Sequence, residues 1–315
     1  MIKPGCIAGS WFAGLFLFCG GATAQESIAS KICQLAEVAS LDAKTSPDGT
    51  LYLTGDVDGH QGDFLIDTGG LGLVLNYSTA RHLGNGPRPG HGAGIQMIGG
   101  VELNQVVPAN MVQFGNVASP KPWFAVAPDN AIGFSGEIGF FQPHALWPDF
   151  DMEIDFAKAK INLFLTDQCP GHVVYWTHQP YAAVPMSIDA FGHISVHAML
   201  DGKPIEALVD TGAMESILTL DVATRALGIS GATPGLVAKG SRVYNAMVEA
   251  KRYKYPFKTL TFEGISIANP DIAILNTGAV SRSDAFVLGI GVLRQLHLFV
   301  AYDEKKLYLT GAEDR

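Results

Sequence analysis

The fold is decided by the stretch Phe-Leu-Ile-Asp-Thr-Gly at residues 64–69, which returns as Ala-Leu-Val-Asp-Thr-Gly at residues 207–212. In both copies an apolar run leads directly into Asp-Thr-Gly, which predicts a buried strand that ends where a carboxylate emerges. The glycine allows a tight backbone turn just after the acid. Two such strands in equivalent places would bring Asp67 and Asp210 together, and close carboxyl groups can share one proton for acid–base catalysis.

The two copies lie within a longer internal repeat. Asp210 follows Asp67 by 143 residues, and the Asp-Gly pair at 201–202 follows the Asp-Gly pair at 58–59 by the same interval. Each Asp-Gly predicts a hairpin turn, after which a seven-residue strand leads into the motif. The common spacing predicts that the chain contains two copies of one β-rich lobe.

Short helices are expected after the two motifs. Asn76 and Thr219 can each cap a helix, because their side-chain oxygens can accept hydrogen bonds from free backbone N–H groups. Gly84 and Gly228 then suit the ends of these helices. The two glycines are 144 residues apart, so one residue is inserted in the second copy.

The two halves also end alike. Residues 152–163 and 298–309 each have the pattern of two strands around a turn that carries Asp and Lys. Glu-Ile-Gly at residues 137–139 opens this part of the first half, and Val-Leu-Gly at residues 287–289 opens it in the second. This correspondence supports the duplication.

We therefore predict an all-β fold with short helices, built from two tandem lobes at residues 51–165 and 184–315. Residues 166–183, which contain Pro and Gly, are predicted to link them. Residues 25–50 form an N-terminal lead-in before the first lobe. Its apolar residues have the spacing of a short helix, which is one interpretation of this segment: Ile28, Ile32, Leu35 and Val38.

Residues 1–24 are expected to be a signal peptide. Lys3 provides the positive start, an apolar stretch follows, and Ala-Thr-Ala at residues 22–24 is a small-residue cleavage site. The apolar run is shorter than the roughly 20 residues that span a bilayer. A lipoprotein at Cys19 is disfavoured by the bulky Phe18 before it. We expect a protein exported to the periplasm or secreted, without a stable membrane anchor.

The charge composition excludes two classes of partner. The formal net charge is −9 and there is no basic run, which argues against nucleic acid and anionic membranes as partners.

No cofactor and no metal site is expected, because His193 and His197 share a strand face without a third ligand. Four acidic residues alternate along one strand and are interpreted as a solvated face: Asp149, Asp151, Glu153 and Asp155.

Two cysteines, Cys33 and Cys169, remain once residues 1–24 are removed. An exported chain with two thiols most simply pairs them in a disulfide. The alternative is two unrelated buried thiols.

On these residues the chain resembles the aspartic proteases, particularly bacterial proteins built from retropepsin-like domains. Leu-Val-Asp-Thr-Gly-Ala at residues 208–213 matches the motif of retroviral-type lobes, and Val-Leu-Gly at 287–289 is similar to the later apolar-apolar-Gly signature. The closing stretch 293–309 is similar to the end of the bacterial lobes. The resemblance implies a bilobal acid-protease fold of two β-barrel lobes in one chain, active as a monomer on peptide or protein substrates.

The resemblance also implies roles for the matched residues. Asp67 and Asp210 would hold one water, with one carboxylate taking its proton while the other, protonated, binds the substrate carbonyl. Supporting roles fall on the rest of the two motifs. The two threonines would brace the loops against each other, and the two glycines would let backbone N–H groups reach the carboxylates: Thr68, Thr211, Gly69 and Gly212.

Flaps, which are mobile hairpins over the substrate in this family, are expected after the short helices. In the first lobe the candidate is the Gly-rich stretch 90–100, with Gly92 and Gly94. In the second lobe it is residues 235–245, with Tyr244. Ordinary Gly-rich surface loops are the alternative for both.

The first motif departs from the second just after its glycine. It continues Gly-Leu-Gly-Leu at residues 70–73, whereas the second continues Ala-Met-Glu-Ser at 213–216, so Leu73 stands in the place of Ser216. The first lobe could therefore hold its Asp less firmly. This departure motivates an alternative to the aspartic endopeptidase, namely a non-catalytic module that binds peptides or a partner protein. Pairing of Asp loops between two chains is a third interpretation.

Overall fold

The computed structural model describes residues 33–90, 95–96, 102–129, 136–244, 248–276 and 286–312. Gln34–Arg315 forms one compact unit. The expected signal peptide at residues 1–24 lies outside the described residues. In the part of the chain that is described, no helix is long and apolar enough to cross a membrane.

The predicted duplication is visible in the strands around both motifs. Three strands of the first half recur 143 residues later with the same bounds: β3 (Leu51–Val57), β4 (His60–Ile66) and β5 (Leu73–Asn76) become β17 (Ile194–Leu200), β18 (Lys203–Val209) and β19 (Ser216–Thr219). The two Asp-Gly turns are confirmed. Asp58 and Gly59 have φ of 51° and 89°, and Asp201 and Gly202 have φ of 49° and 74°, as tight hairpin turns require.

Both predicted helix caps are confirmed. Asn76 accepts a hydrogen bond from the amide of Thr79 at the start of α1 (Tyr77–Ala80), and Thr219 caps α3 (Leu220–Val222) in the same way. In the second half a π-helical turn, η1 (Ala223–Leu227), carries the chain to Gly228, which ends it with φ of 73°.

The expectation that the first helix reaches Gly84 is wrong. Helix α1 ends at Ala80, and the chain continues in tight turns, in which the amide of His82 bonds to the carbonyl of Thr79 and that of Leu83 to Ala80. These bonds span three residues instead of four, so the α-helical ladder stops there.

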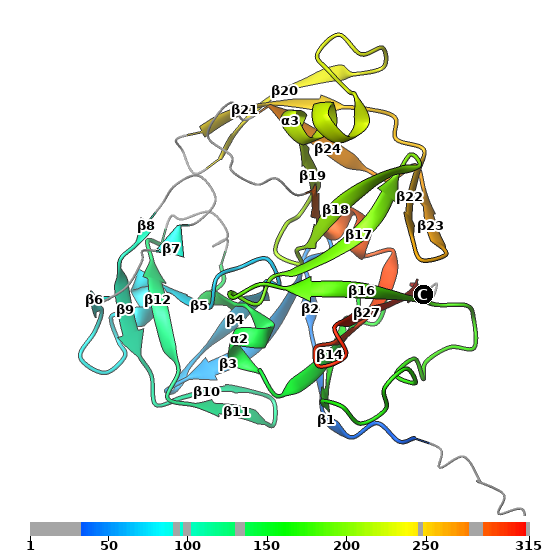
Figure 1. Cartoon of the computed structure of the whole chain (residues 1–315). Helices are drawn as coiled ribbons and strands as arrows, with labels where there is room; N and C mark the ends of the chain where they lie inside the picture. The colour runs from blue at the N-terminus through cyan, green and yellow to red at the C-terminus, as the bar shows by residue number, and fades with distance from the viewer. Residues whose placement is uncertain are drawn as a thin grey trace, which may run out of the picture. The chain divides into compact units, whose positions relative to one another are not determined.

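The first half forms a ten-stranded sheet in which β4 lies centrally, between β3 and β13 (Gly139–Phe141). Strand β13 is parallel to β4 and antiparallel to β5. This central place explains why Phe64 and Ile66 are buried. The other strands complete the order (Figure 1): β2 (Lys44–Thr45), β6 (Arg88–Pro89), β9 (Gln105–Pro108), β10 (Met111–Phe114), β11 (Val117–Pro120) and β12 (Trp123–Ala127), while β7 (Ile95–Gln96) and β8 (Glu102–Leu103) pair separately.

The second half repeats this arrangement around β18. Strand β25 (Phe286–Leu288) is parallel to β18, as β13 is to β4, and it borders β19. The remaining strands are β20 (Val237–Tyr244), β21 (Val248–Lys254), β22 (Thr259–Phe262), β23 (Ile265–Ala268) and β24 (Ile272–Asn276). In Figure 1 the strands from β20 to β24 are drawn in yellow and orange.

The two halves share one sheet at their ends. The predicted terminal hairpins are β14 (Phe150–Asp155) with β15 (Lys160–Leu165), and β26 (Leu296–Ala301) with β27 (Lys306–Gly311). Strand β14 pairs with β26, and β16 (Ala182–Ile188) pairs with β27. The fold is therefore all-β with short helices, as predicted, and its two lobes are joined by a continuous hydrogen-bonded ladder.

A short helix in the lead-in is not observed among the described residues. Glu37–Asp42 instead forms strand β1, which pairs with β15 at the edge of the shared sheet. Ala39 and Leu41 are buried and alternate with exposed neighbours, so a strand buries them where a helix would not. Ile28 and Ile32 lie outside the described residues.

The interpretation of the acidic strand as a solvated face is wrong for Asp151, Glu153 and Asp155, which are all buried. Strand β14 lies between β15 and β26, so its side chains are covered. Glu153 lies 2.6 Å from Nε2 of His297 and accepts hydrogen bonds from Asn162 and Tyr175. Buried carboxylates need such partners. Only Asp149 of the four is exposed.

Asp151→Asn is expected to stabilise the protein above neutral pH. Burial raises the pKa of Asp151 to about 7 from 3.8, so between about pH 4 and 7 the folded chain binds a proton that the unfolded chain does not. The free energy of unfolding therefore falls as pH rises through this window. The asparagine can still accept the hydrogen bond that the amide of Tyr302 donates at 2.8 Å.

We expect Asp151→Asn to raise the free energy of unfolding by roughly 2–4 kcal/mol at pH 8, with the gain shrinking towards zero near pH 4. Urea unfolding at several pH values measures this. Asp149→Asn, at an exposed position two residues before Asp151, is the control and should change the free energy of unfolding little. A gain that did not vary with pH would contradict the assigned protonation.

Cys33 and Cys169 are both disulfide-bonded in the structure. Cys169 is buried. The pairing of one with the other stays a prediction.

Candidate active site

The structure brings Asp67 and Asp210 together at the ends of the two equivalent strands β4 and β18. The amide of Asp67 bonds to the carbonyl of Phe141 and the amide of Asp210 to that of Leu288, each at 3.0 Å. These matched bonds tie each motif to the neighbouring parallel strand. Because both carboxyl groups come from one chain, the pair is complete without a second copy.

The two threonines hold the loops together through reciprocal hydrogen bonds. The amide of Thr68 donates to Oγ1 of Thr211 at 3.1 Å, and the amide of Thr211 donates to Oγ1 of Thr68 at 3.0 Å. Each hydroxyl in turn donates across the interface, Thr68 to the carbonyl of Val209 at 2.7 Å and Thr211 to that of Ile66 at 2.6 Å. Both side chains are buried, so the network is shielded from water.

The two motif glycines are required by close packing against the opposite carboxyl group. A Cβ at Gly69 would lie 2.3 Å from Cγ of Asp210, and a Cβ at Gly212 would lie 2.5 Å from Cγ of Asp67. Neither distance leaves room for a side chain. Their amides also face the carboxylates of their own loops, because Gly69 donates to Asp67 at 3.1 Å and Gly212 donates to Asp210 at 2.9 Å.

Burial and the contact between Asp67 and Asp210 shift the pKa values of both carboxyl groups. Burial raises the pKa of Asp67 well above its ordinary value, and the adjacent charge and hydrogen bond of Asp210 raise it further. Burial also raises the pKa of Asp210, but bonds from Gly212, Asp67 and Ala213 oppose that shift. The pair therefore titrates as a unit and shares one proton.

In the strands beside the motifs, the residues of the two lobes that are equivalent in the structure differ from the predicted ones. Strand pairing places Phe141 opposite Ile66 and Leu288 opposite Val209, so Gln142 occupies the place of Gly289. The expectation that Gly139 corresponds to Gly289 is wrong, because the parallel ladder sets the register. Each of these residues precedes a short helix, α2 (Pro143–Leu146) or α4 (Ile290–Leu293).

The departure of the first motif changes its local contacts. In the second lobe the hydroxyl of Ser216 accepts from the amide of Gly289 at 3.0 Å. In the first lobe Leu73 and Gln142 stand in these places, and neither forms that bond. The amide of Gln142 bonds instead to the carbonyl of Gly72 at 2.8 Å. The loop after Asp67 is thus held by different groups.

His193 is the residue near the motifs that the sequence did not indicate. Its Nε2 lies 3.2 Å from the carbonyl oxygen of Gly70, 123 residues away. The repeat could not reveal it, because Thr50 stands in the equivalent place of the first half. His197 is exposed.

The predicted flaps are only partly described. Gly92 and Gly94 lie outside the described residues. Tyr244 is the last residue of β20, which forms a hairpin with β21. A flap at the second position stays a prediction.

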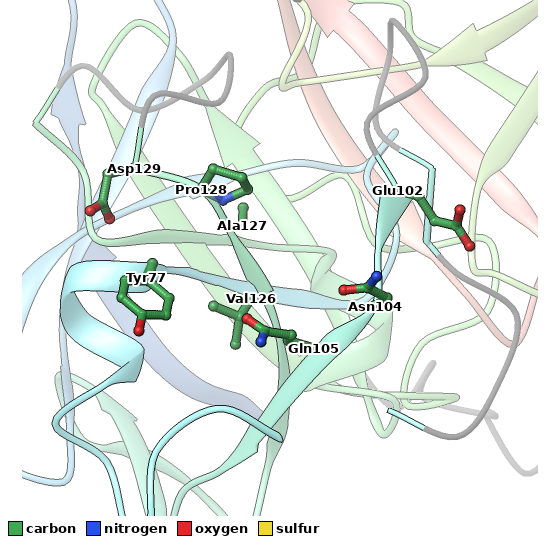
Figure 2. A pocket seen from close by; sticks show the side chains of 8 residues that line it. All are labelled: Tyr77, Glu102, Asn104, Gln105, Val126, Ala127, Pro128 and Asp129. Atoms are coloured by element: carbon green, nitrogen blue, oxygen red, sulfur yellow. The ribbon is translucent and has the colours of Figure 1, made fainter. Parts of the chain in front are cut away.

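The first half contains a pocket of about 320 Å³, which begins beside the first residue of α1, Tyr77 (Figure 2). It is lined by Tyr77, Glu102, Asn104, Gln105, Val126, Ala127, Pro128 and Asp129. It contains no residue of either motif. Within the described ranges, no cluster of three or more His, Cys, Asp or Glu side chains is arranged to hold a metal ion.

Comparison with protein families gives one match for each half of the chain. The profile of a family described as aspartyl protease matches residues 53–139 and 196–292. Each matched segment contains one Asp-Thr-Gly, and together they cover more than half of the sequence. No curated protein matches the chain.

Proposed function

The chain belongs to the aspartyl protease family, and we propose that it is an aspartic endopeptidase that hydrolyses peptide bonds with Asp67 and Asp210. The observation that carries this proposal is the hydrogen-bonded pair of carboxyl groups, one from each lobe, held by the threonine network. A general acid and a general base with separated pKa values are what hydrolysis by an activated water needs.

In the proposed reaction, ionised Asp210 takes a proton from a water that lies between the two acids, and the resulting hydroxide attacks the substrate carbonyl carbon. Protonated Asp67 donates its proton to the carbonyl oxygen, which gives a tetrahedral diol. Asp210 then passes its proton to the amide nitrogen, and Asp67 takes one back from a diol hydroxyl as the C–N bond breaks. The products are a carboxylic acid and an amine, and the pair returns to its starting protonation.

The substrate we propose is a peptide or protein in an extended conformation, met in the periplasm or outside the cell. Extended peptides can bind through main-chain hydrogen bonds to strand edges. The acidic net charge of −9 does not favour nucleic acid. We propose that the chain acts as a monomer, since one chain supplies both acids.

The test is incubation of residues 25–315 with a diverse peptide pool from about pH 3 to 7, a range that brackets the titration of a carboxyl pair. Mass spectrometry of the new termini identifies cleaved bonds, and the Asp210→Asn protein is treated in parallel. Cleavage by the parent alone supports the proposal. A folded parent that cleaves nothing at any pH contradicts it.

The second candidate is a module that binds peptides without turnover. It is favoured by the altered loop at residues 70–73, where Leu73 replaces the hydroxyl that Ser216 supplies in the other lobe. This candidate predicts peptide binding that is equal in the parent and in the Asp210→Asn protein, with no new termini in either.

A further inference from the structure

The turn between β16 and β17 is held by its own hydrogen bonds and contacts the first lobe. It spans Asp189 to His193, whose backbones bond to each other at 3.1 Å. Oδ1 of Asp189 also accepts from the amides of Phe191 at 2.8 Å and His193 at 3.0 Å. These bonds fix the turn internally, so a side chain on it is well placed to hold a group outside it.

One contact of this turn reaches the loop of the first motif. Nε2 of His193 lies 3.2 Å from the carbonyl oxygen of Gly70, and Nδ1 lies 2.9 Å from Oδ2 of Asp189. Both partners can only accept hydrogen bonds. A neutral imidazole has one N–H, so only the doubly protonated ring can donate to both. In that doubly protonated form, His193 bridges Asp189 and the loop of the first motif.

A second contact holds the turn from the other side. Nε2 of Gln142 donates to the carbonyl of Gly192 at 2.6 Å, while its Oε1 accepts from Ala145 and caps α2. Gln142 is fully buried. Gly192 has φ of 86°, and a Cβ there would lie 2.6 Å from the Gln142 amide nitrogen, so the approach needs glycine. The backbone amide of Gln142 also donates to the carbonyl of Gly72. The loop from Gly70 to Gly72 is therefore attached to this turn at both ends, at Gly70 through His193 and at Gly72 through Gln142.

In the second lobe the carbonyl of Ala213, the equivalent of Gly70, accepts a hydrogen bond from the amide of Ile290 at 2.8 Å. In the first lobe Pro143 stands in the place of Ile290 and has no N–H to donate. We propose that His193, held by Asp189, is a positioning residue that fixes the loop after Asp67 by donating to the carbonyl of Gly70, and thereby takes over in the first lobe the role of the Ile290 amide. The proposal rests on the proposed protease function, because it assigns His193 an effect on catalysis through Asp67.

The charge of His193 adds a second consequence. Among the described residues, its ring contacts the Asp189 carboxylate, the Gly70 carbonyl and the Phe191 ring, the last at 6.0 Å between centroids. Asp210 interacts with it through charge. The nearby His193 charge lowers the pKa of Asp210. Loss of the cation would raise that pKa, so the singly protonated state of the pair would move to higher pH.

The test compares His193→Phe, which keeps a ring without N–H groups, with His193→Gln, which keeps one donor without charge. His197→Phe, on an exposed histidine of β17, is the matched control. We expect His193→Phe to lower kcat for a cleaved peptide about 10- to 100-fold, as misplaced catalytic groups do, with KM changed less than about threefold. We expect His193→Gln to retain more of kcat, and both variants to show a pH profile shifted upward.

Hydrogen exchange of the amides at residues 69–73 gives a readout that does not depend on activity. We expect faster exchange there in His193→Phe than in the parent or in His197→Phe. Unchanged exchange in His193→Phe overturns the proposal, and so does an unchanged kcat and pH profile in a parent that cleaves. A parent that never cleaves contradicts the protease function instead, and the exchange result then decides whether His193 positions the loop.

Discussion

Replacing either Asp67 or Asp210 by asparagine is expected to lower kcat/KM for peptide cleavage by at least about 10³-fold. The amide of asparagine cannot take a proton from water at Asp210, and it cannot supply the proton of Asp67 to the substrate carbonyl. The loss should appear mainly in kcat, measured on the best peptide from the pool. The double variant should be little worse than either single variant, because the two acids act as one unit.

The chain offers matched controls for this experiment. Asp63 and Glu206 lie four residues before Asp67 and Asp210 on β4 and β18, in equivalent places of the repeat. Asp63→Asn and Glu206→Gln should keep kcat/KM within about twofold, since neither residue reaches the carboxyl pair. Unfolding curves should show that the asparagine variants at the pair remain folded. Full activity in either of them would rule out the proposed mechanism.

Replacing Thr68 or Thr211 by valine is expected to lower the free energy of unfolding by roughly 2–5 kcal/mol. Valine fills nearly the same space but removes a buried hydroxyl that both donates and accepts. In Thr68→Val the carbonyl of Val209 and the amide of Thr211 lose their partners. Leaving two buried backbone groups without hydrogen bonds is costly because water cannot replace the partner.

Serine at the same positions separates the hydrogen bonds from packing. Thr68→Ser keeps the hydroxyl and loses one methyl group, so it should cost only about 1 kcal/mol. Urea unfolding of the parent and the two variants at one pH makes the comparison. Equal stability of Thr68→Val and Thr68→Ser would show that the reciprocal bonds do not hold the lobes together.

The parts of the fold that the sequence predicts well depend on local patterns. Strands β4 and β18 follow from an apolar run between an Asp-Gly turn and Asp-Thr-Gly, and each signal lies within ten residues of the next. The caps Asn76 and Thr219 are likewise local, because the acceptor and the amide it caps are three residues apart. Because the same signals recur in the second half, the duplication could be predicted from the sequence.

The parts that were missed depend on pairing between distant segments. The burial of Glu153 follows from its place beside β26 and its contact with His297, 144 residues away. The match of Gly139 with Gly289 followed a three-residue pattern, whereas the parallel ladder puts Gln142 there. His193 reaches Gly70 only because a turn of the second lobe crosses to the first. No local pattern contains this information.

The pH dependence of kcat/KM tests most directly whether Asp67 and Asp210 share one proton. We expect a bell-shaped profile, because the reaction needs one ionised and one protonated acid, and rates fall when the pair gains or loses a proton. Its two limbs should report apparent pKa values of the pair, and the profile should be absent in Asp210→Asn. A rate that keeps rising through neutral pH, or an unchanged bell in Asp210→Asn, would contradict the central claim.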